Sequence, residues 1–300
     1  KYYREMLSGG IIESDQIPSI EEVARWAYSY FWEDLYKPYA GIKPQQPLCQ
    51  TLIKPALDKL LPLLEQNNLA GLKDWLNSNN ALFKSNLPDV EGNSMLMLML
   101  KLFLKAQKVM DAKILEVWES LLKDIFEKYP KQLSSPDLKS QTPLMLAVEA
   151  RETMLVEQML AAGANANIQN YQGMTALHTA CKIRSPKVFD TFCTESSDWN
   201  LRTVDGRLPL HTACWSGNIY VVEKLVHLAP KQLWEKDHSG FTPLELVENL
   251  IENPEALQML EQQSRKNGYS CGTQQELEKI LEVLEHNLSM NSYFLSLKAL

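Results

Sequence analysis

The cysteine whose surroundings best suit nucleophilic chemistry is Cys271. It lies in the loop NGYSCGT, directly before a predicted helix start at Thr273. A thiol near a helix N-terminus can have a lowered pKa and can act as a nucleophile. It also needs a histidine as base, and the nearest upstream candidate, His238, belongs to a turn. One hypothesis is therefore a cysteine-dependent enzyme of the protease or deamidase type that uses Cys271.

The other cysteines and the helix-borne histidines favour structure over chemistry. The chain has five cysteines, an odd number without a pairing pattern, which is typical of reduced thiols. Cys181 and Cys214 each end a copy of His-Thr-Ala-Cys, at a position that small buried residues favour. His178 and His211 would lie roughly 10 Å apart on stacked helices, too far to share a zinc ion. We expect no catalytic residue, no metal site and no cofactor.

Composition and charge exclude several classes of function. Apolar residues make up 45% of the 300 residues and charged residues 22%, which indicates a folded chain. The net charge is −7, which argues against binding to the phosphate backbone of a nucleic acid. No apolar run reaches the roughly 18 residues of a membrane span. The motifs of nucleotide-binding loops, zinc proteases, serine hydrolases and kinases are also missing.

A repeat with a period of 33 to 34 residues organises the chain. The stretches DLKSQTPLMLAV, NYQGMTALHTAC, TVDGRLPLHTAC and DHSGFTPLELVE start at 137, 170, 203 and 237, and a degenerate version, DVEGNSMLMLML, starts at 89. The phrase PKQL occurs at 130–133 and again at 230–233, three repeat lengths later. We interpret this phrase as a chance match between two loops, whose proline stops a helix, and not as a site.

These units resemble the ankyrin repeat, whose mark is Thr-Pro-Leu-His-x-Ala at a 33-residue period. Threonine in this motif caps the first helix of a unit, proline fits its first turn, and glycine suits the preceding tip. Ser140 replaces that glycine in one unit, Leu208 replaces the capping threonine in another, and Arg184 replaces a glycine between two helices. The resemblance implies an all-α ankyrin-repeat solenoid, with each motif histidine as a structural hydrogen bonder between units.

The resemblance also implies a site, because ankyrin proteins typically bind other proteins through the tips and the first-helix face. The chain has large aromatic, methionine and arginine side chains at the corresponding positions, and these types are enriched at binding hot spots. The residues expected to bind a partner are Tyr171, Gln172, Met174, Lys182, Asp205, Arg207, Trp215, His238 and Phe241.

The segments outside the repeats are predicted to be helical. Residues 1–47 form an aromatic-rich segment with a helix from about 20 to 36, and 48–88 read as a diverged capping helix pair. Repeats occupy 89–252, and capping helices follow in 253–300. Thr273 and Glu276 have the spacing of a capping box.

The function expected from the sequence is a non-enzymatic module that binds another protein on the concave face, as a monomer. The irregular repeats and the flanks resemble ankyrin proteins that intracellular bacteria deliver into host cells. This resemblance implies an effector that acts on a host protein in the cytoplasm. The alternatives are the Cys271 enzyme or a scaffold for a catalytic domain that precedes residue 1.

Overall fold

The computed structural model describes residues 56–60, 62, 63, 66, 68–85, 92–107, 112–193, 197–253, 255, 257, 258, 262 and 272–298. The predicted aromatic helix within 1–47 and Cys271 lie outside these residues.

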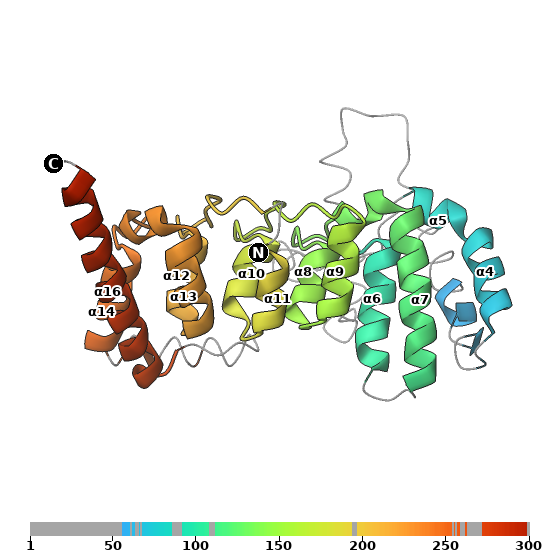
Figure 1. Cartoon of the computed structure of the whole chain (residues 1–300). Coiled ribbons are helices and arrows are strands. Elements are labelled where there is room, and N and C mark those ends of the chain that lie inside the picture. The colour runs from blue at the N-terminus through green and yellow to red at the C-terminus, as the bar shows by residue number, and fades with distance from the viewer. Residues whose placement is uncertain are drawn as a thin grey trace, which may run out of the picture.

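Pairs of antiparallel helices stack side by side in a single row (Figure 1). The four pairs are α6 (Met95–Ala106) with α7 (Ala112–Lys128), α8 (Pro143–Glu149) with α9 (Thr153–Ala161), α10 (Ala176–Lys182) with α11 (Pro186–Thr191), and α12 (Pro209–Ser216) with α13 (Ile219–Leu228). No strand occurs in the part of the chain that the structure describes. The predicted all-α solenoid is therefore confirmed.

Further helices lie at the two ends of the row. At the start are α4 (Leu69–Ser78) and α5 (Asn80–Ser85), and at the finish are α14 (Pro243–Glu252) and the long α16 (Gln274–Lys298). The extra residues of the degenerate unit lengthen its helices: α7 has 17 residues, whereas α9, α11 and α13 have 6 to 10.

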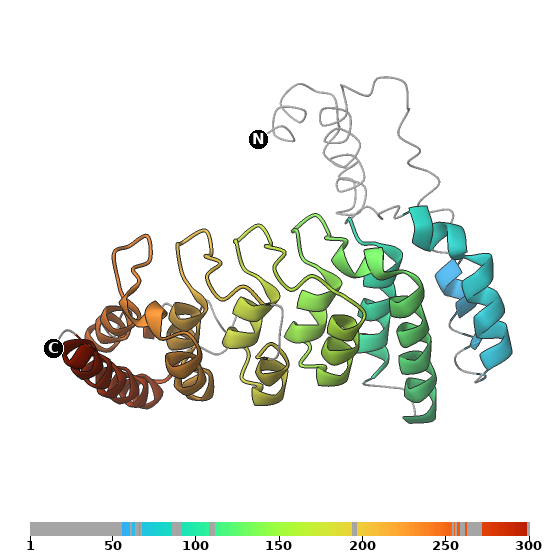
Figure 2. The ribbon, with the colours of Figure 1, turned by 45° about the horizontal axis from the view of Figure 1, so that its top comes forward.

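A row of hairpin loops projects from the helix pairs on one side of the solenoid (Figure 2). Each loop has one residue in the left-handed backbone region near its tip: Gly173, Gly206 and Gly240 have φ of 71°, 75° and 85°. Ser140 stands at the matching place with φ 57°. The tip thus requires a positive φ, and glycine meets that requirement without steric cost.

Threonine caps explain where the first helices begin. The Oγ1 of Thr142, Thr175 and Thr242 accepts a hydrogen bond from the backbone N–H three residues later, at 3.2, 3.3 and 3.3 Å. Leu208 stands at the same position before α12 and offers no such acceptor. Proline follows the capping position in three of these helices. The predicted caps and the predicted missing cap are confirmed.

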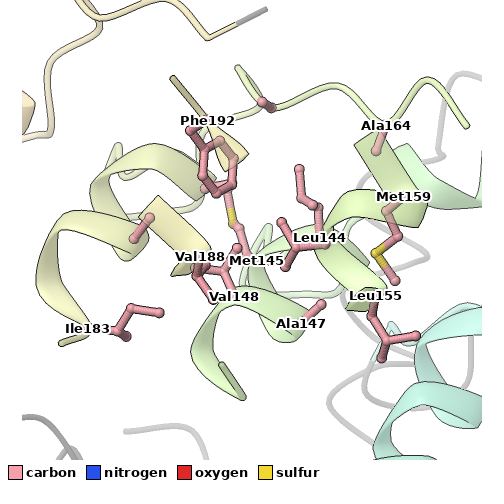
Figure 3. Packing of buried hydrophobic residues seen from close by; sticks show 14 of the residues in the cluster. Leu144, Met145, Ala147, Val148, Leu155, Met159, Ala164, Ile183, Val188 and Phe192 are labelled. Carbon is pink, nitrogen blue, oxygen red and sulfur yellow. The ribbon is translucent and has the colours of Figure 1, made fainter. Parts of the chain in front are cut away.

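The core runs between the stacked units. Around α8 it brings together apolar residues of two neighbouring units (Figure 3), namely Leu144, Met145, Ala147, Val148, Leu155, Met159, Ala164, Ile183, Val188 and Phe192. Each of these is at most 6% exposed. Burying a side chain of this size stabilises the folded state by about 1.5–3 kcal/mol, so each unit depends on its neighbours for stability.

The interpretation of the repeated PKQL phrase as a chance match was wrong. Both copies form short 3₁₀ helices, η2 (Pro130–Ser134) and η3 (Pro230–Trp234), and both place a glutamine in the interior at 1–2% exposure. Gln132 Nε2 donates to Phe83 O at 2.7 Å, and Gln232 Nε2 donates to Trp199 O at 2.5 Å. Each glutamine therefore satisfies a backbone carbonyl of the preceding unit, so the phrase has the same structural role in both places.

The helix after Thr273 is tied to the units that precede it. Thr273 and Glu276 form the predicted capping box, since Thr273 N donates to Glu276 Oε2 at 2.9 Å and Glu276 N donates to Thr273 Oγ1 at 3.4 Å. Both terminal nitrogens of Arg184 donate to the same carboxylate, at 2.6 and 2.8 Å. Arg184, which replaces a loop glycine, thereby anchors the start of α16.

Candidate partner-binding face

The tip of each hairpin is shaped by the polar side chain at its first position. Asp137 Oδ1 accepts hydrogen bonds from the backbone N–H of the residues two and four positions later, at 2.8 and 2.9 Å. Asn170 and Asp237 make the same pair of bonds, and Thr203 makes the second of them. An acceptor at this place satisfies the backbone of a tight turn. Sequence reasoning missed this role, although Asp or Asn at three of four starts was the available signal.

Backbone hydrogen bonds join neighbouring tips into one continuous edge. Tyr171 N donates to Lys139 O at 3.2 Å, Val204 N to Gln172 O at 2.9 Å, and His238 N to Asp205 O at 2.9 Å. The tips are therefore held in register, and residues at the same position of successive units form rows.

The second position of the tips forms an exposed apolar row. Leu138 is 62% exposed, and Tyr171 and Val204 are each 64% exposed. Only Tyr171 of these three was among the expected binding residues. The structure adds Leu138 and Val204 to the exposed apolar surface beside it, and their shared position in the repeat was the signal that could have found them.

Two cations lie close to the ring of Trp215 on the first-helix face. Lys182 Nζ is 5.7 Å from the centroid of its ring, and Arg207 Cζ is 5.9 Å from it. These three expected residues come from three different elements, namely α10, the tip before α12, and α12 itself. All three are half-buried. The structure thus brings them together into one cluster with cation–π contacts.

An acidic side chain of the next unit forms an ion pair with Arg207. Arg207 Nε lies 3.6 Å from Asp237 Oδ2, and the Asp237 side chain is only 1% exposed. Asp237 Oδ1 is already occupied by two backbone N–H groups of its own turn. Asp237 was not among the expected residues, because its contact with Arg207 joins two units and does not show in either one alone.

The remaining expected residues divide into two groups. Met174 and Phe241 are half-buried. They occupy the same position in their tips as Arg207 does in the tip between them, so one lies on each side of Arg207. We call Met174, Lys182, Arg207, Trp215 and Phe241 the concave patch.

Gln172, Asp205 and His238 are exposed at the tips, outside the concave patch. Gln172 and Asp205 contribute backbone carbonyls to the edge. A Cβ added to Gly206 would lie 2.8 Å from Cγ of His238. The imidazole of His238 therefore packs on the neighbouring tip. Their placement does not join them to the Trp215 cluster.

The two motif histidines bridge neighbouring units, as the resemblance implied. His178 Nε2 lies 3.3 Å from Arg207 O, and His211 Nε2 lies 3.1 Å from Phe241 O. A carbonyl can only accept, so Nε2 is the protonated nitrogen and Nδ1 is an acceptor, which in His178 faces Thr175 Oγ1 at 2.9 Å. Burial lowers the pKa of His178 to about 4 and also lowers the pKa of His211. Both imidazoles are therefore neutral near pH 7 and serve to position the tips.

The thiols within the described residues are poorly suited to nucleophilic chemistry. Cys181 and Cys214 are fully buried, and burial raises the pKa of both. Cys193 is half-buried and its pKa is also raised, chiefly by burial. The described part of the chain contains no group of three His, Cys, Asp or Glu side chains placed to hold a metal ion. Nor does any described helix combine the length and the apolar character needed to cross a membrane.

Comparison with known proteins identifies the repeats. The family model described as ankyrin repeats, three copies, matches residues 109–203 and 144–237. Ankyrin repeats thus occur within residues 109–237, and the stacked helix pairs with projecting tips are consistent with an all-α ankyrin-repeat solenoid.

One curated protein resembles part of this chain. It is the NF-kappa-B inhibitor delta of Mus musculus, which is 34% identical over 65 residues. The matched segment covers 22% of this chain and 20% of that protein. The chain thus spans about a fifth of the length of the curated relative that it matches.

Proposed function

We propose that this protein is a non-enzymatic module that binds a partner protein through the concave patch. The observation that carries the proposal is the Trp215 cluster, in which Lys182 and Arg207 both make cation–π contacts with a half-buried indole on the solenoid. The solenoid fold does not require a tryptophan there, since the previous unit has a lysine at the same position. Tryptophan and arginine are the residue types most enriched at hot spots of binding.

Two further findings support a function exerted on another protein. The chain contains ankyrin repeats, and this repeat class presents extended surfaces to protein partners. The similar segment in the mouse belongs to a protein that is named as an inhibitor of NF-kappa-B. The identity of the partner does not follow from either finding, because one fold serves many functions.

The test is a double substitution within the patch. Trp215→Ala with Arg207→Ala should abolish capture of the partner, while the melting temperature stays within a few degrees. The matched control is Trp234→Ala with Lys231→Ala, which removes a tryptophan and a cationic side chain from exposed positions on η3. If the control lowers capture as much as the patch variant does, the concave patch is not the binding site. If the patch variant is unfolded, Trp215→Phe replaces it in the same assay.

We further propose that the partner is a host protein and that the chain acts as a bacterial effector in the host cytoplasm. This finer proposal rests on the character of the irregular repeats and flanking segments. Affinity capture with the full chain, run in parallel on a host-cell lysate and a bacterial lysate, tests it by mass spectrometry. A patch-dependent partner found only among bacterial proteins would contradict the effector role.

The enzymatic alternative, in which Cys271 is a nucleophile, has its own test. A thiol-directed activity probe at neutral pH should label Cys271 no faster than Cys193 when the protein is a binding module. Selective labelling of Cys271, lost when a competing substrate is added, would overturn the binding module as the sole function. The described neighbours of Cys271 serve structure, because Gly272 packs against Gly217 and Thr273 caps α16.

A further inference from the structure

We propose that the concave patch recognises an acidic segment of its partner. An aspartate or glutamate side chain would be held by Arg207 and Lys182, with apolar side chains against Met174, Trp215 and Phe241. This inference rests on the proposed function and adds the chemistry of the partner to it.

The guanidinium of Arg207 contacts an acidic side chain of the next unit and the ring of Trp215. Its Nε faces Asp237 Oδ2 at 3.6 Å, and its guanidinium lies over the Trp215 ring. Within the described residues, neither terminal nitrogen of Arg207 donates a hydrogen bond, and 26% of the side chain is exposed. A guanidinium fixed in this way presents two parallel N–H donors, which match the two oxygens of a carboxylate.

The acid that holds Arg207 does not compete for those donors. Asp237 is 1% exposed, and its Oδ1 accepts from the backbone N–H of Ser239 and Phe241. Only Oδ2 faces Arg207, and it faces Nε rather than the terminal nitrogens. Asp237 therefore orients the guanidinium and leaves its outer edge available to an incoming carboxylate.

Lys182 adds a second positive charge on the same ring. Its Nζ lies 5.7 Å from the Trp215 centroid, and burial lowers its pKa, while Glu149 acts in the opposite direction. A half-buried ammonium group has lost part of its hydration, so an approaching anion stabilises its charged form. The Trp215 ring thus has two positive charges within 6 Å of its centroid.

Charge balance favours a carboxylate over a phosphate or a cation. The two cations of the patch are already partly offset by Glu149 and Asp237. A phosphorylated residue carries about −1.5 to −2 charges and would require more positive charge than the patch supplies. A cationic partner would meet an indole that already has Lys182 and Arg207 as neighbours. An amphipathic acidic segment matches the charges and the apolar frame of Met174 and Phe241.

The experiment selects short random peptides displayed on phage against the full chain. The enriched sequences should contain aspartate or glutamate beside large apolar residues. A synthetic copy of one enriched peptide is then titrated by fluorescence anisotropy against the wild type and against Arg207→Gln, Lys182→Gln and the control Lys187→Gln. Lys187 is an exposed lysine on α11, so its substitution makes the same change in charge away from the patch.

We expect Arg207→Gln and Lys182→Gln each to weaken binding about tenfold, and Lys187→Gln to leave it unchanged. Replacing the acidic residue of the peptide by its amide should weaken binding to the wild type about tenfold but have little further effect on Arg207→Gln. Arg207→Lys keeps the positive charge opposite Asp237 but loses the two parallel N–H donors of the guanidinium. This variant therefore distinguishes a loss of carboxylate recognition from a loss of folding.

The outcomes distinguish this inference from the proposed function. Peptides that lose binding with Trp215→Ala but contain no acidic residue would overturn the acidic partner and leave the binding module in place. Peptides that bind only when phosphorylated, or that are enriched in lysine and arginine, would also overturn it. If no enriched peptide depends on the patch, both proposals fail.

Discussion

Two neighbouring repeat units, residues 170–202 and 203–236, share their first-helix sequence and differ at the surface and at the loop ends. Both contain His-Thr-Ala-Cys, and in both the histidine reaches the carbonyl of the next tip. At the variable surface positions the first unit has Met174 and Lys182, whereas the second has Arg207 and Trp215. The shared residues maintain the stack, and the differing residues form the concave patch.

The loops between the paired helices show a different kind of contrast. The first unit has Arg184, which reaches across to Glu276 in α16. The second unit has Gly217 at the same position, with φ 69° and the backbone of Gly272 packed against it. One loop thus anchors the C-terminal helix through a charge pair and the other through close backbone contact. The following substitutions test the contacts in these units and in the unit that precedes them.

The largest loss of stability should come from Gly217→Ala. A Cβ there would collide with the Cα of Gly272, and φ of 69° is unfavourable for alanine in addition. We expect the free energy of unfolding to fall by about 3 kcal/mol or more. Urea denaturation followed by circular dichroism measures the change.

Gly163→Ala is the matched control for the collision. Its φ is 87°, but no atom lies within 4 Å of the added Cβ, so only backbone strain remains. We expect about 1 kcal/mol for this variant. Equal losses for the two glycines would mean that the contact with Gly272 contributes nothing.

Substituting a buried glutamine of the PKQL phrase should have the next largest effect. Gln232 accepts from Leu210 N at 3.0 Å and donates to Trp199 O, so Gln232→Ala removes the partner of one buried and one partly buried backbone group. The expected cost is about 2–3 kcal/mol. Gln172→Ala, at an exposed tip, should stay within about 0.5 kcal/mol in the same urea titration. A loss at Gln232 no larger than that at Gln172 would restore the chance interpretation of the phrase.

Acid should weaken the bridge between the two units. The pKa of His178 is lowered by burial to about 4, so between pH 6.5 and 4 the unfolded chain binds a proton that the folded chain does not. This contribution to stability is complete above pH 6.5 and decreases as the pH falls toward 4. At pH 5 the loss from His178 should reach about 2 kcal/mol.

The variant His178→Asn separates this effect from general acid destabilisation. It is expected to be less stable at pH 7 but to lose about 2 kcal/mol less than the wild type between pH 7 and pH 5. Urea titrations at the two pH values give the difference. Parallel losses in the two proteins would assign the acid sensitivity to other groups.

The sequence predicted the features that lie within one unit better than those that join two units. The threonine caps, the tip glycines and the Thr273–Glu276 box follow from local backbone chemistry and were predicted correctly. The buried roles of Gln132 and Gln232 were not, because their partners lie in the preceding unit. The Arg207–Asp237 contact was missed for the same reason.

The exposure of the expected binding residues was likewise predicted within one unit but not across units. Tyr171 was placed correctly at an exposed tip from its position in the repeat, and the repeat period sufficed for that. Lys182, Arg207 and Trp215 were expected on one face, but their arrangement around one ring depends on how the units stack, and no spacing in the sequence fixes it. Whether this face binds a partner stays a prediction.

The smallest effect should come from Ser140→Gly, which makes the unit at 137 match its neighbours. Ser140 has φ 57°, a region that glycine occupies without the steric cost that a side chain incurs. The greater freedom of glycine in the unfolded chain offsets part of this gain, so we expect stabilisation of about 0.5 kcal/mol. The reverse change, Gly173→Ser, should destabilise by far more, because its Cβ would lie 2.6 Å from Val204 N. The two substitutions together test whether a side chain at the tip is costly because of φ alone or also because the next tip approaches closely. Effects of similar size and opposite sign would leave φ as the only cause.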